Sequence, residues 1–170
     1  MTAACLTLHA GCVVIGETGV LITGTSGAGK SALARALIEA GTARGLFAAL
    51  VADDRVLLTH HHGRLIARPH PLIAGLMEVR GVGIVPMPFE PRAVISHVAD
   101  LCHGPLARMP DSTTTTTTLL GIARPCLQLD SAQSAPSHTS ALLFWLDGQR
   151  SLDRVPKVAA SDSSVHFKNF

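Results

Sequence analysis

The stretch that decides the fold is Gly24-Thr25-Ser26-Gly27-Ala28-Gly29-Lys30-Ser31, which matches the pattern G-x-x-x-x-G-K-S/T of a phosphate-binding loop. In such a loop, glycines let successive backbone N–H groups converge on phosphate oxygens, and the helix that follows adds the positive end of its dipole. Lys30 supplies a mobile cation for the outer phosphates, and Ser31 supplies a hydroxyl for Mg²⁺. We therefore expect this loop to bind ATP together with Mg²⁺.

The flanks of the loop have the secondary structure that phosphate binding requires. Residues 20–23 are apolar and strand-like, and residues 31–40 are rich in helix formers, with Gly41 as the stop signal. Upstream, residues 6–15 are also strand-like and are followed by the turn-forming Glu17-Thr18-Gly19. This linker is too short for a crossover, so the two strands must form an antiparallel hairpin and the sheet must be partly antiparallel.

The rest of the chain predicts further strands and a final helix. The threonine run at 112–118 has high β-propensity but no alternating pattern, which favours a low-complexity loop over a strand. Residues 151–170 resemble a flexible tail, so we expect one mixed α/β domain over residues 1–150. The remaining predictions are strands at 47–52, 56–59, 65–67, 93–101 and 127–129 and helices at 71–77 and 135–146.

The composition of the chain argues against several classes of protein. The net charge of +2 is too small to indicate a nucleic acid or an anionic membrane as partner, and no apolar run reaches the 18 residues of a membrane span. The four cysteines form no C-x-x-C pair and follow no secretory segment, so we expect reduced thiols in the cytoplasm. The single Asn, Asn169, leaves no guanine reader of the Asn-Lys-x-Asp type, which argues against a GTPase.

Two adjacent carboxylates follow the strand at 47–52. Because neighbouring side chains on a strand point to opposite faces, one of Asp53 and Asp54 could face the metal while the other accepts a hydroxyl proton. A solvated strand end is the alternative. Glu78 and Arg80, in a glycine-flanked segment, suit a second metal contact and a phosphate contact, or else a surface ion pair. The run 60–62 of three histidines reads as a solvated turn, and we assign it no role.

These residues resemble the catalytic, C-terminal domain of the bacterial HPr(Ser) kinase/phosphorylase, in the short form known in some proteobacteria. The resemblance rests on His9, on residues 24–31, on Val51-Ala52-Asp53-Asp54 and on Glu78-Val79-Arg80-Gly81-Val82-Gly83-Ile84, which occur in the family's order. It implies a phosphate-binding loop on a phosphoenolpyruvate-carboxykinase-like fold. It also implies an ATP-dependent serine kinase acting on the phosphocarrier protein HPr within a regulatory phosphotransferase system.

The resemblance further implies roles for single residues. Lys30 would contact the transferred phosphoryl group, Ser31 and Glu78 would bind Mg²⁺ with Asp53 beside them, and His9 would belong to the active site. Asp54 would be the central acid-base group, both in the kinase direction and in the reverse reaction, in which phosphate releases pyrophosphate. By the same resemblance, Arg108 would be the equivalent of a family arginine, and a homo-oligomer is expected because the family forms hexamers.

Two other functions remain open from the sequence. A small-molecule kinase would use the same loop and Asp54 on a metabolite hydroxyl. A nucleotide-sensing module would bind ATP and regulate a partner without any chemistry, and it would have no need of Asp54.

Overall fold

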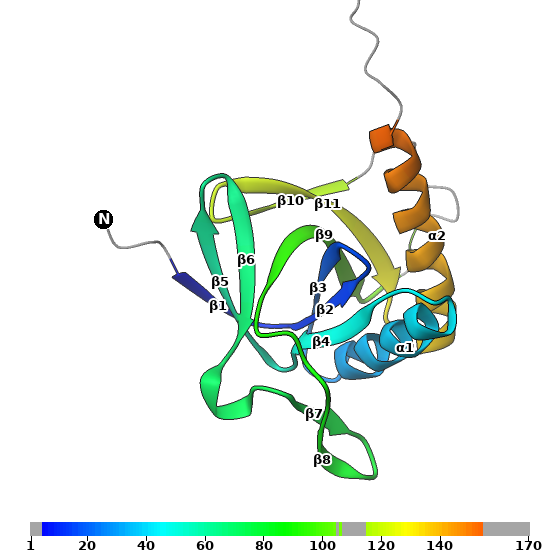
Figure 1. Ribbon diagram of the computed structural model, residues 1–170. Coiled ribbons are helices and arrows are strands. Elements are labelled where there is room, and N and C mark those ends of the chain that lie inside the picture. The colour runs from blue at the N-terminus through cyan, green and yellow to red at the C-terminus, as the bar shows by residue number, and fades with distance from the viewer. Residues whose placement is uncertain (1–4, 105, 107–114, 155–170) are drawn as a thin grey trace, which may run out of the picture.

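In the computed structural model, which describes residues 5–104, 106 and 115–154, a strongly curved mixed sheet carries two helices along one side, and a small hairpin projects from the body (Figure 1). The elements in chain order are β1 (Cys5–His9), β2 (Gly11–Ile15), β3 (Thr18–Gly24), α1 (Lys30–Ala43), β4 (Ala48–Ala52), β5 (Arg55–His61), β6 (Arg64–Pro69), the 3-10 turn η1 (Pro71–Ile73), β7 (Leu76–Val79), β8 (Gly83–Pro86), β9 (Ala93–Cys102), β10 (Thr115–Leu119), β11 (Ile122–Asp130) and α2 (Ala135–Arg154).

The sheet is mixed, as predicted. Its main path runs β1-β5-β6-β9-β3-β2-β4, and β11 adds to β9 and carries β10. The pairs β3 with β9 and β9 with β11 are parallel, whereas the other strand pairs in the described part of this sheet are antiparallel. Strand β9 is the branch point, because its first residues pair with β6 and its last residues pair with β11.

The predicted strand at 6–15 is two strands. The chain breaks at Ala10, whose N–H donates to Asp54 O at 3.2 Å, so β1 pairs with β5 while β2 pairs with β3 and β4. An unbroken apolar run gives no sign of this change of partner. The β2–β3 hairpin itself is confirmed, although its turn falls at 16–17 and Thr18 already belongs to β3.

The core lies on both faces of the curved sheet. One apolar cluster packs the sheet against α1 and α2, and the other fills the inside of its curl. Helix α1 does not stop at Gly41 as predicted: a Cβ at Gly41 would lie 2.9 Å from Ala48 Cβ, so this glycine permits close packing of the helix on β4. The helix-facing cluster includes Ile22, Leu33, Leu37, Leu50 and Leu142, and the inner cluster includes Leu21, Val51, Leu58, Leu65 and Ile95.

The prediction of a loop at 112–118 is wrong for its second half. Residues 115–118 belong to β10, which pairs antiparallel with β11 through a turn at Leu120 and Gly121. Both turn residues have positive φ, 48° and 79°, as the tightest hairpin turns require. Backbone pairing with β11 and the β-branched threonines together outweigh the missing alternation. Residues 112–114 lie outside the described part of the chain.

Two helix predictions also change. The helix predicted at 71–77 is a single 3-10 turn, because Gly75, with φ of 72°, turns the chain into β7. Helix α2 begins at Ala135 as predicted but continues to Arg154, so residues 151–154 are helical rather than part of a tail. Residues 155–170 lie outside the described part. No helix in the described residues has the length and apolarity to cross a bilayer.

Candidate active site

The phosphate-binding loop connects β3 to α1, as predicted. Two features require a glycine at position 24, where the loop begins. Gly24 has a φ of 139°, and a Cβ there would lie 2.7 Å from Leu101 O on the neighbouring β9. Gly27 and Gly29 have φ of 77° and 99° with open space around them, so only the backbone conformation demands glycine there. The parallel pairing of β3 with β9 therefore sets where the loop begins.

Lys30 is folded back onto its own loop. Its Nζ donates to Gly24 O at 3.0 Å and to Thr25 O at 2.9 Å, and the residue is only 7% exposed. Burial lowers the pKa of Lys30, and the nearby carboxylates Asp54 and Asp53 oppose that effect. An ammonium has three N–H donors, so one remains for a phosphate oxygen.

Asp53 is buried beneath the start of α1. Its Oδ1 accepts from Ser31 Oγ at 2.8 Å and its Oδ2 accepts from Glu78 N–H at 3.1 Å, so one carboxylate joins α1 to β7. Burial raises the pKa of Asp53, whereas these two hydrogen bonds favour its charged form and oppose the rise. Because Ser31 donates its proton to Asp53, the lone pairs of the Ser31 oxygen remain available to a cation.

Asp54 is the exposed neighbour and has an unusual backbone. Its φ is 67°, and Arg55 N–H donates to Asp53 O at 2.8 Å across it, which makes Asp54 the centre of a γ-turn of the rarer, positive-φ kind. His9 Nδ1 lies 2.8 Å from Asp54 Oδ1, and both side chains are about half exposed, at 51% and 57%. The turn thus sends Asp53 inward and Asp54 outward, where His9 meets it.

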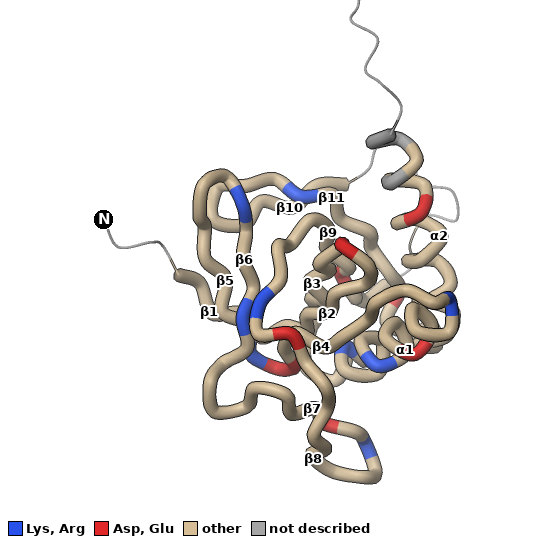
Figure 2. The backbone as a smooth tube through the Cα atoms, in the orientation of Figure 1, with Lys and Arg blue, Asp and Glu red and all other residues tan. Residues whose placement is uncertain are grey.

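One cavity of about 460 Å³ joins these groups. Figure 2 shows both acidic and basic positions on the β7–β8 hairpin, which closes one side of the cavity through residues 77–80. Among the described residues, no group of three or more His, Cys, Asp or Glu side chains is placed to hold a metal ion by itself. The predicted site residues that line the cavity are His9, Ser26, Gly27, Gly29, Lys30, Ser31, Asp53, Asp54, Glu78 and Arg80.

Some predicted residues lie elsewhere. Gly24, Thr25 and Ala28 shape the loop but do not line the cavity; the Thr25 hydroxyl instead lies 2.9 Å from His103 Nε2. Arg108 lies outside the described residues. The histidines at 60–62 are exposed around the β5–β6 turn, where His60 Nε2 accepts from Gly63 N–H at 3.2 Å.

The sequence interpretation missed two residues of this region. Arg35, which the sequence predictions do not include, lines the cavity; its position four residues after Ser31, on the same face of α1, is the signal that could have revealed it. His103, just after β9, contacts the phosphate-binding loop, and no pattern in the sequence points to it.

The chain is similar to a known protein family. The chain matches the family model described as "HPr Serine kinase C-terminal domain" over residues 2–89, more than half of its 170 residues. The matched part contains every predicted site residue except Arg108.

Curated relatives match over the same part. The HPr kinase/phosphorylase of Mycoplasma mycoides subsp. mycoides SC is 45% identical over 76 residues, which cover 45% of this chain and 22% of that protein. The HPr kinase/phosphorylase of Clostridium tetani is 42% identical over 81 residues, which cover 48% of this chain and 25% of that protein. The matched region thus spans about a quarter of the length of these relatives.

Among solved structures, the Hpr(Ser) kinase/phosphatase from Coxiella burnetii superposes with a TM-score of 0.70 at 25% sequence identity. The superposition covers 86% of this chain and 99% of that chain, so the likeness in fold extends past residue 89.

Proposed function

Because the chain belongs to the family of HPr serine kinase C-terminal domains, we propose that it is an ATP-dependent kinase that phosphorylates a serine of the phosphocarrier protein HPr. The observation that carries this proposal is the shared cavity. It holds the loop lysine, an exposed carboxylate and a histidine that contacts that carboxylate. A phosphoryl transfer needs a charge clamp on the phosphates and a base for the attacking hydroxyl, and both lie here.

Lys30 and the loop form the charge clamp. Two donors of Lys30 Nζ are used on Gly24 O and Thr25 O, which hold the ammonium at the start of α1. The remaining donor contacts a γ-phosphate oxygen and stabilises the charge that develops there. We expect the loop residues 24–31 to bind the rest of the triphosphate tail.

Asp54 acts as the base. Its carboxylate accepts the proton of the serine hydroxyl as that oxygen attacks the γ-phosphorus, and the bond from the γ-phosphorus to the bridging oxygen breaks to release ADP. His9 Nδ1–H donates to Asp54 Oδ1, which orients the carboxylate and leaves Oδ2 for the proton. In the reverse direction, the protonated Asp54 returns its proton to the serine oxygen while inorganic phosphate attacks phosphorus and pyrophosphate forms.

The side chains near the N-terminus of α1 suit the coordination of a magnesium ion. Ser31 Oγ has lone pairs free because its proton goes to Asp53, and the Glu78 carboxylate lines the same cavity. A bound Mg²⁺ takes few side chains besides phosphates and water, and it neutralises the phosphate charge. We propose Ser31 and Glu78 as its contacts, with Asp53 beside them to orient Ser31, and Arg80 and Arg108 as phosphate contacts.

The setting follows from the family. We propose that the kinase works in the cytoplasm on the HPr of a regulatory phosphotransferase system, and that it assembles as a homo-oligomer, by family resemblance a hexamer. A protein substrate needs an open site, and the half-exposed Asp54 offers one.

The test is a transfer assay with the purified chain, ATP, Mg²⁺ and purified HPr, followed by phosphopeptide mapping. We expect phosphate on one serine of HPr, and transfer slowed by about a hundredfold or more with Asp54→Asn. A parallel panel of metabolite hydroxyls tests the small-molecule kinase, which would phosphorylate a metabolite and leave HPr unmodified. Regulation of a partner by the Asp54→Asn variant, with ATP bound and no transfer by either protein, would instead identify a nucleotide sensor.

A further inference from the structure

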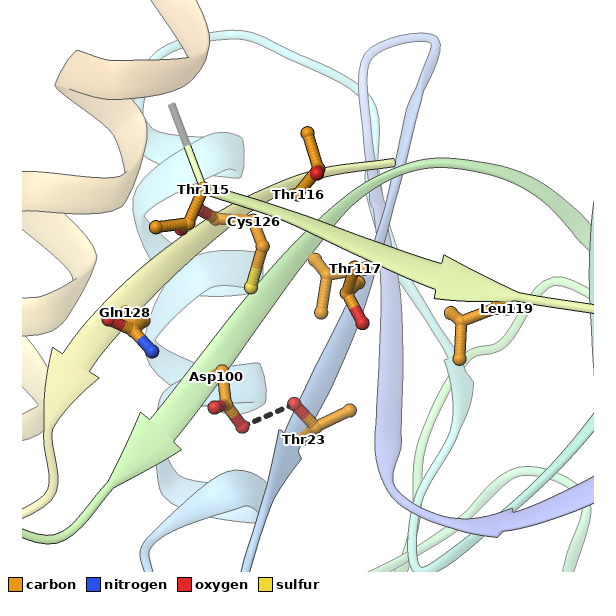
Figure 3. Close-up of a pocket in the computed structure, with 9 residues that line it drawn as sticks. Thr23, Asp100, Thr115, Thr116, Thr117, Leu119, Cys126 and Gln128 are labelled. Carbon is orange, nitrogen blue, oxygen red and sulfur yellow. Dashed lines mark hydrogen bonds between the residues drawn. The ribbon is translucent and has the colours of Figure 1, made fainter. Parts of the chain in front are cut away.

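A second cavity lies on the inner side of the sheet, beneath β10. It has a volume of about 250 Å³ and shares no lining residue with the active-site cavity. Strand β10 crosses above β9 and β3. Figure 3 shows Thr117 and Leu119 pointing from β10 toward these two strands, into the space that separates them from β10. Its lining consists of Thr23, Val98, Asp100, Thr115, Thr116, Thr117, Leu119, Cys126 and Gln128.

The cavity contains one charged group. Asp100 Oδ1 accepts from Thr23 Oγ1 at 2.6 Å, and among the described residues no side chain or backbone group donates to Asp100 Oδ2. No lysine, arginine or histidine is among the residues that line the cavity in the described part of the chain. Burial, together with the nearby Asp100 charge, raises the pKa of Cys126 to about 11, so its thiol stays neutral. Among the described residues that line the cavity, the carboxylate therefore has hydroxyl, thiol and amide neighbours but no cation.

The other polar groups are neutral, and the threonine hydroxyls and the side-chain amide of Gln128 can accept hydrogen bonds as well as donate them. Thr115 Oγ1 donates to Cys126 O at 2.5 Å, which leaves its lone pairs free, and Thr117 adds a second hydroxyl oxygen. Val98 and Leu119 form an apolar wall beside them. The cavity thus offers a negative charge and hydroxyl oxygens next to a small aliphatic surface.

We propose that this cavity binds a small organic molecule that carries one primary ammonium group on a short aliphatic chain. The three donors of an ammonium match Asp100 Oδ2 and the surrounding hydroxyl oxygens, and the chain packs on Val98 and Leu119. An anion would be repelled by the Asp100 carboxylate, and no cationic side chain among the described lining residues would offset that repulsion.

The same lining disfavours other cations. A quaternary ammonium needs aromatic faces, and the residues that line the described cavity include no aromatic side chain. A guanidinium binds a carboxylate best through both oxygens, and Thr23 already occupies one lone pair of Asp100 Oδ1. Pockets for drug-sized ligands measure roughly 300–1,000 Å³, so the size of this one fits a smaller molecule.

The test uses propylamine and ethanolamine as probes, with 1-propanol and ethylene glycol as neutral counterparts of similar size. Binding is followed through the methyl NMR signals of Val98 and Leu119, which lie in the wall of the cavity. We expect saturable shifts with at least one amine and none with the alcohols at equal concentration. Absence of saturable shifts with both amines, or equal shifts with the alcohols, overturns the proposal.

Matched variants locate the interaction. Asp100→Asn keeps an oxygen to accept from Thr23 but removes the charge, and it should weaken amine binding by at least about tenfold. Thr117→Val keeps the shape of the side chain and should weaken binding by a few-fold. Glu17→Gln removes the same charge at the β2–β3 turn, away from the cavity, and should leave binding unchanged. An Asp100→Asn protein that is folded by its NMR spectrum and binds the amines as tightly as the parent would disprove the proposal.

Discussion

His103 Nε2 lies 2.9 Å from Thr25 Oγ1, which ties the phosphate-binding loop to the end of β9. The other nitrogen of the same ring, Nδ1, lies 2.8 Å from Ser131 Oγ, and Ser131 N–H donates to Cys102 O at 2.9 Å. The backbone carbonyl of Thr25 accepts from Lys30 Nζ. Through the side chain and the backbone of Thr25, a series of hydrogen-bonded residues therefore runs from the end of β11 to the loop lysine. The loop is therefore held from two sides, by β3 and by this ring.

Removing the ring should loosen the loop. We expect His103→Ala to weaken ATP binding by a few-fold, as the loss of one hydrogen bond of about 1 kcal/mol predicts. Calorimetry with ATP on His103→Ala, Thr25→Val and the double variant checks this result. If the contact acts as described, the double variant binds ATP no more weakly than either single variant; additive losses would show that the two residues act separately.

Two glycines of the same loop, Gly24 and Gly27, should differ in their tolerance of alanine. Gly24→Ala meets an unfavourable φ and the Leu101 carbonyl, whereas Gly27→Ala meets only the unfavourable φ. We expect losses in the free energy of unfolding of about 3 kcal/mol or more for Gly24→Ala and about 1 kcal/mol for Gly27→Ala. Urea denaturation of both variants measures the difference, and equal losses would contradict the close approach of β9.

Asp54→Asn should separate binding from chemistry. The amide cannot take up a proton at neutral pH, so we expect the transfer rate to fall by about 10²- to 10⁴-fold. Asparagine tolerates the positive φ at this position, so the fold and the dissociation constant for ATP should change little. Single-turnover transfer to HPr and calorimetry with ATP measure the two quantities. A variant that transfers phosphate at the parent rate would remove Asp54 from the mechanism.

Asp53 should make stability depend on pH. Burial raises its folded-state pKa above the unfolded value of about 3.9, so its stabilising contribution is complete below that value and is lost as the pH rises through the folded pKa. Asp53→Asn does not titrate. The unfolding free energy of the parent minus that of the variant should therefore fall between pH 4 and pH 7.

Urea denaturation of the parent and of Asp53→Asn at a series of pH values checks whether their difference in unfolding free energy falls as the pH rises. A difference between parent and variant that stays constant or grows with pH would mean that the hydrogen bonds from Ser31 and the Glu78 N–H outweigh burial.

Short-range sequence patterns predicted those elements of the fold that are determined by residues close together in the chain. The glycine spacing of residues 24–31, the helix formers after them and the apolar run before Asp53 each identify their element without knowledge of the rest of the chain. The family resemblance then selected Asp54, His9 and Glu78, which the structure brings to one cavity.

What the sequence did not predict depends on contacts between distant residues. The break at Ala10 exists because Asp54 O accepts its N–H, and β10 exists because residues 115–119 find a partner in β11. The contact of His103 with Thr25 joins residues 78 positions apart, and the periodicity of neighbouring residues gives no indication of contacts over such a separation. Helix α2 passes beyond the predicted end at 146 and continues through Gly148, so here, as at Gly41, a glycine lies inside a helix instead of after its end.

The branching of β9 has a consequence for how the protein is made. Its two neighbours on one edge, β6 and β11, and its neighbour β3 on the other come from widely separated parts of the chain. During synthesis, the strand that leads into the nucleotide loop therefore has no parallel neighbour until residues 93–102 have left the ribosome. Nucleotide affinity should consequently emerge late in folding, and the amides of β9 should be among the slowest to exchange with deuterium.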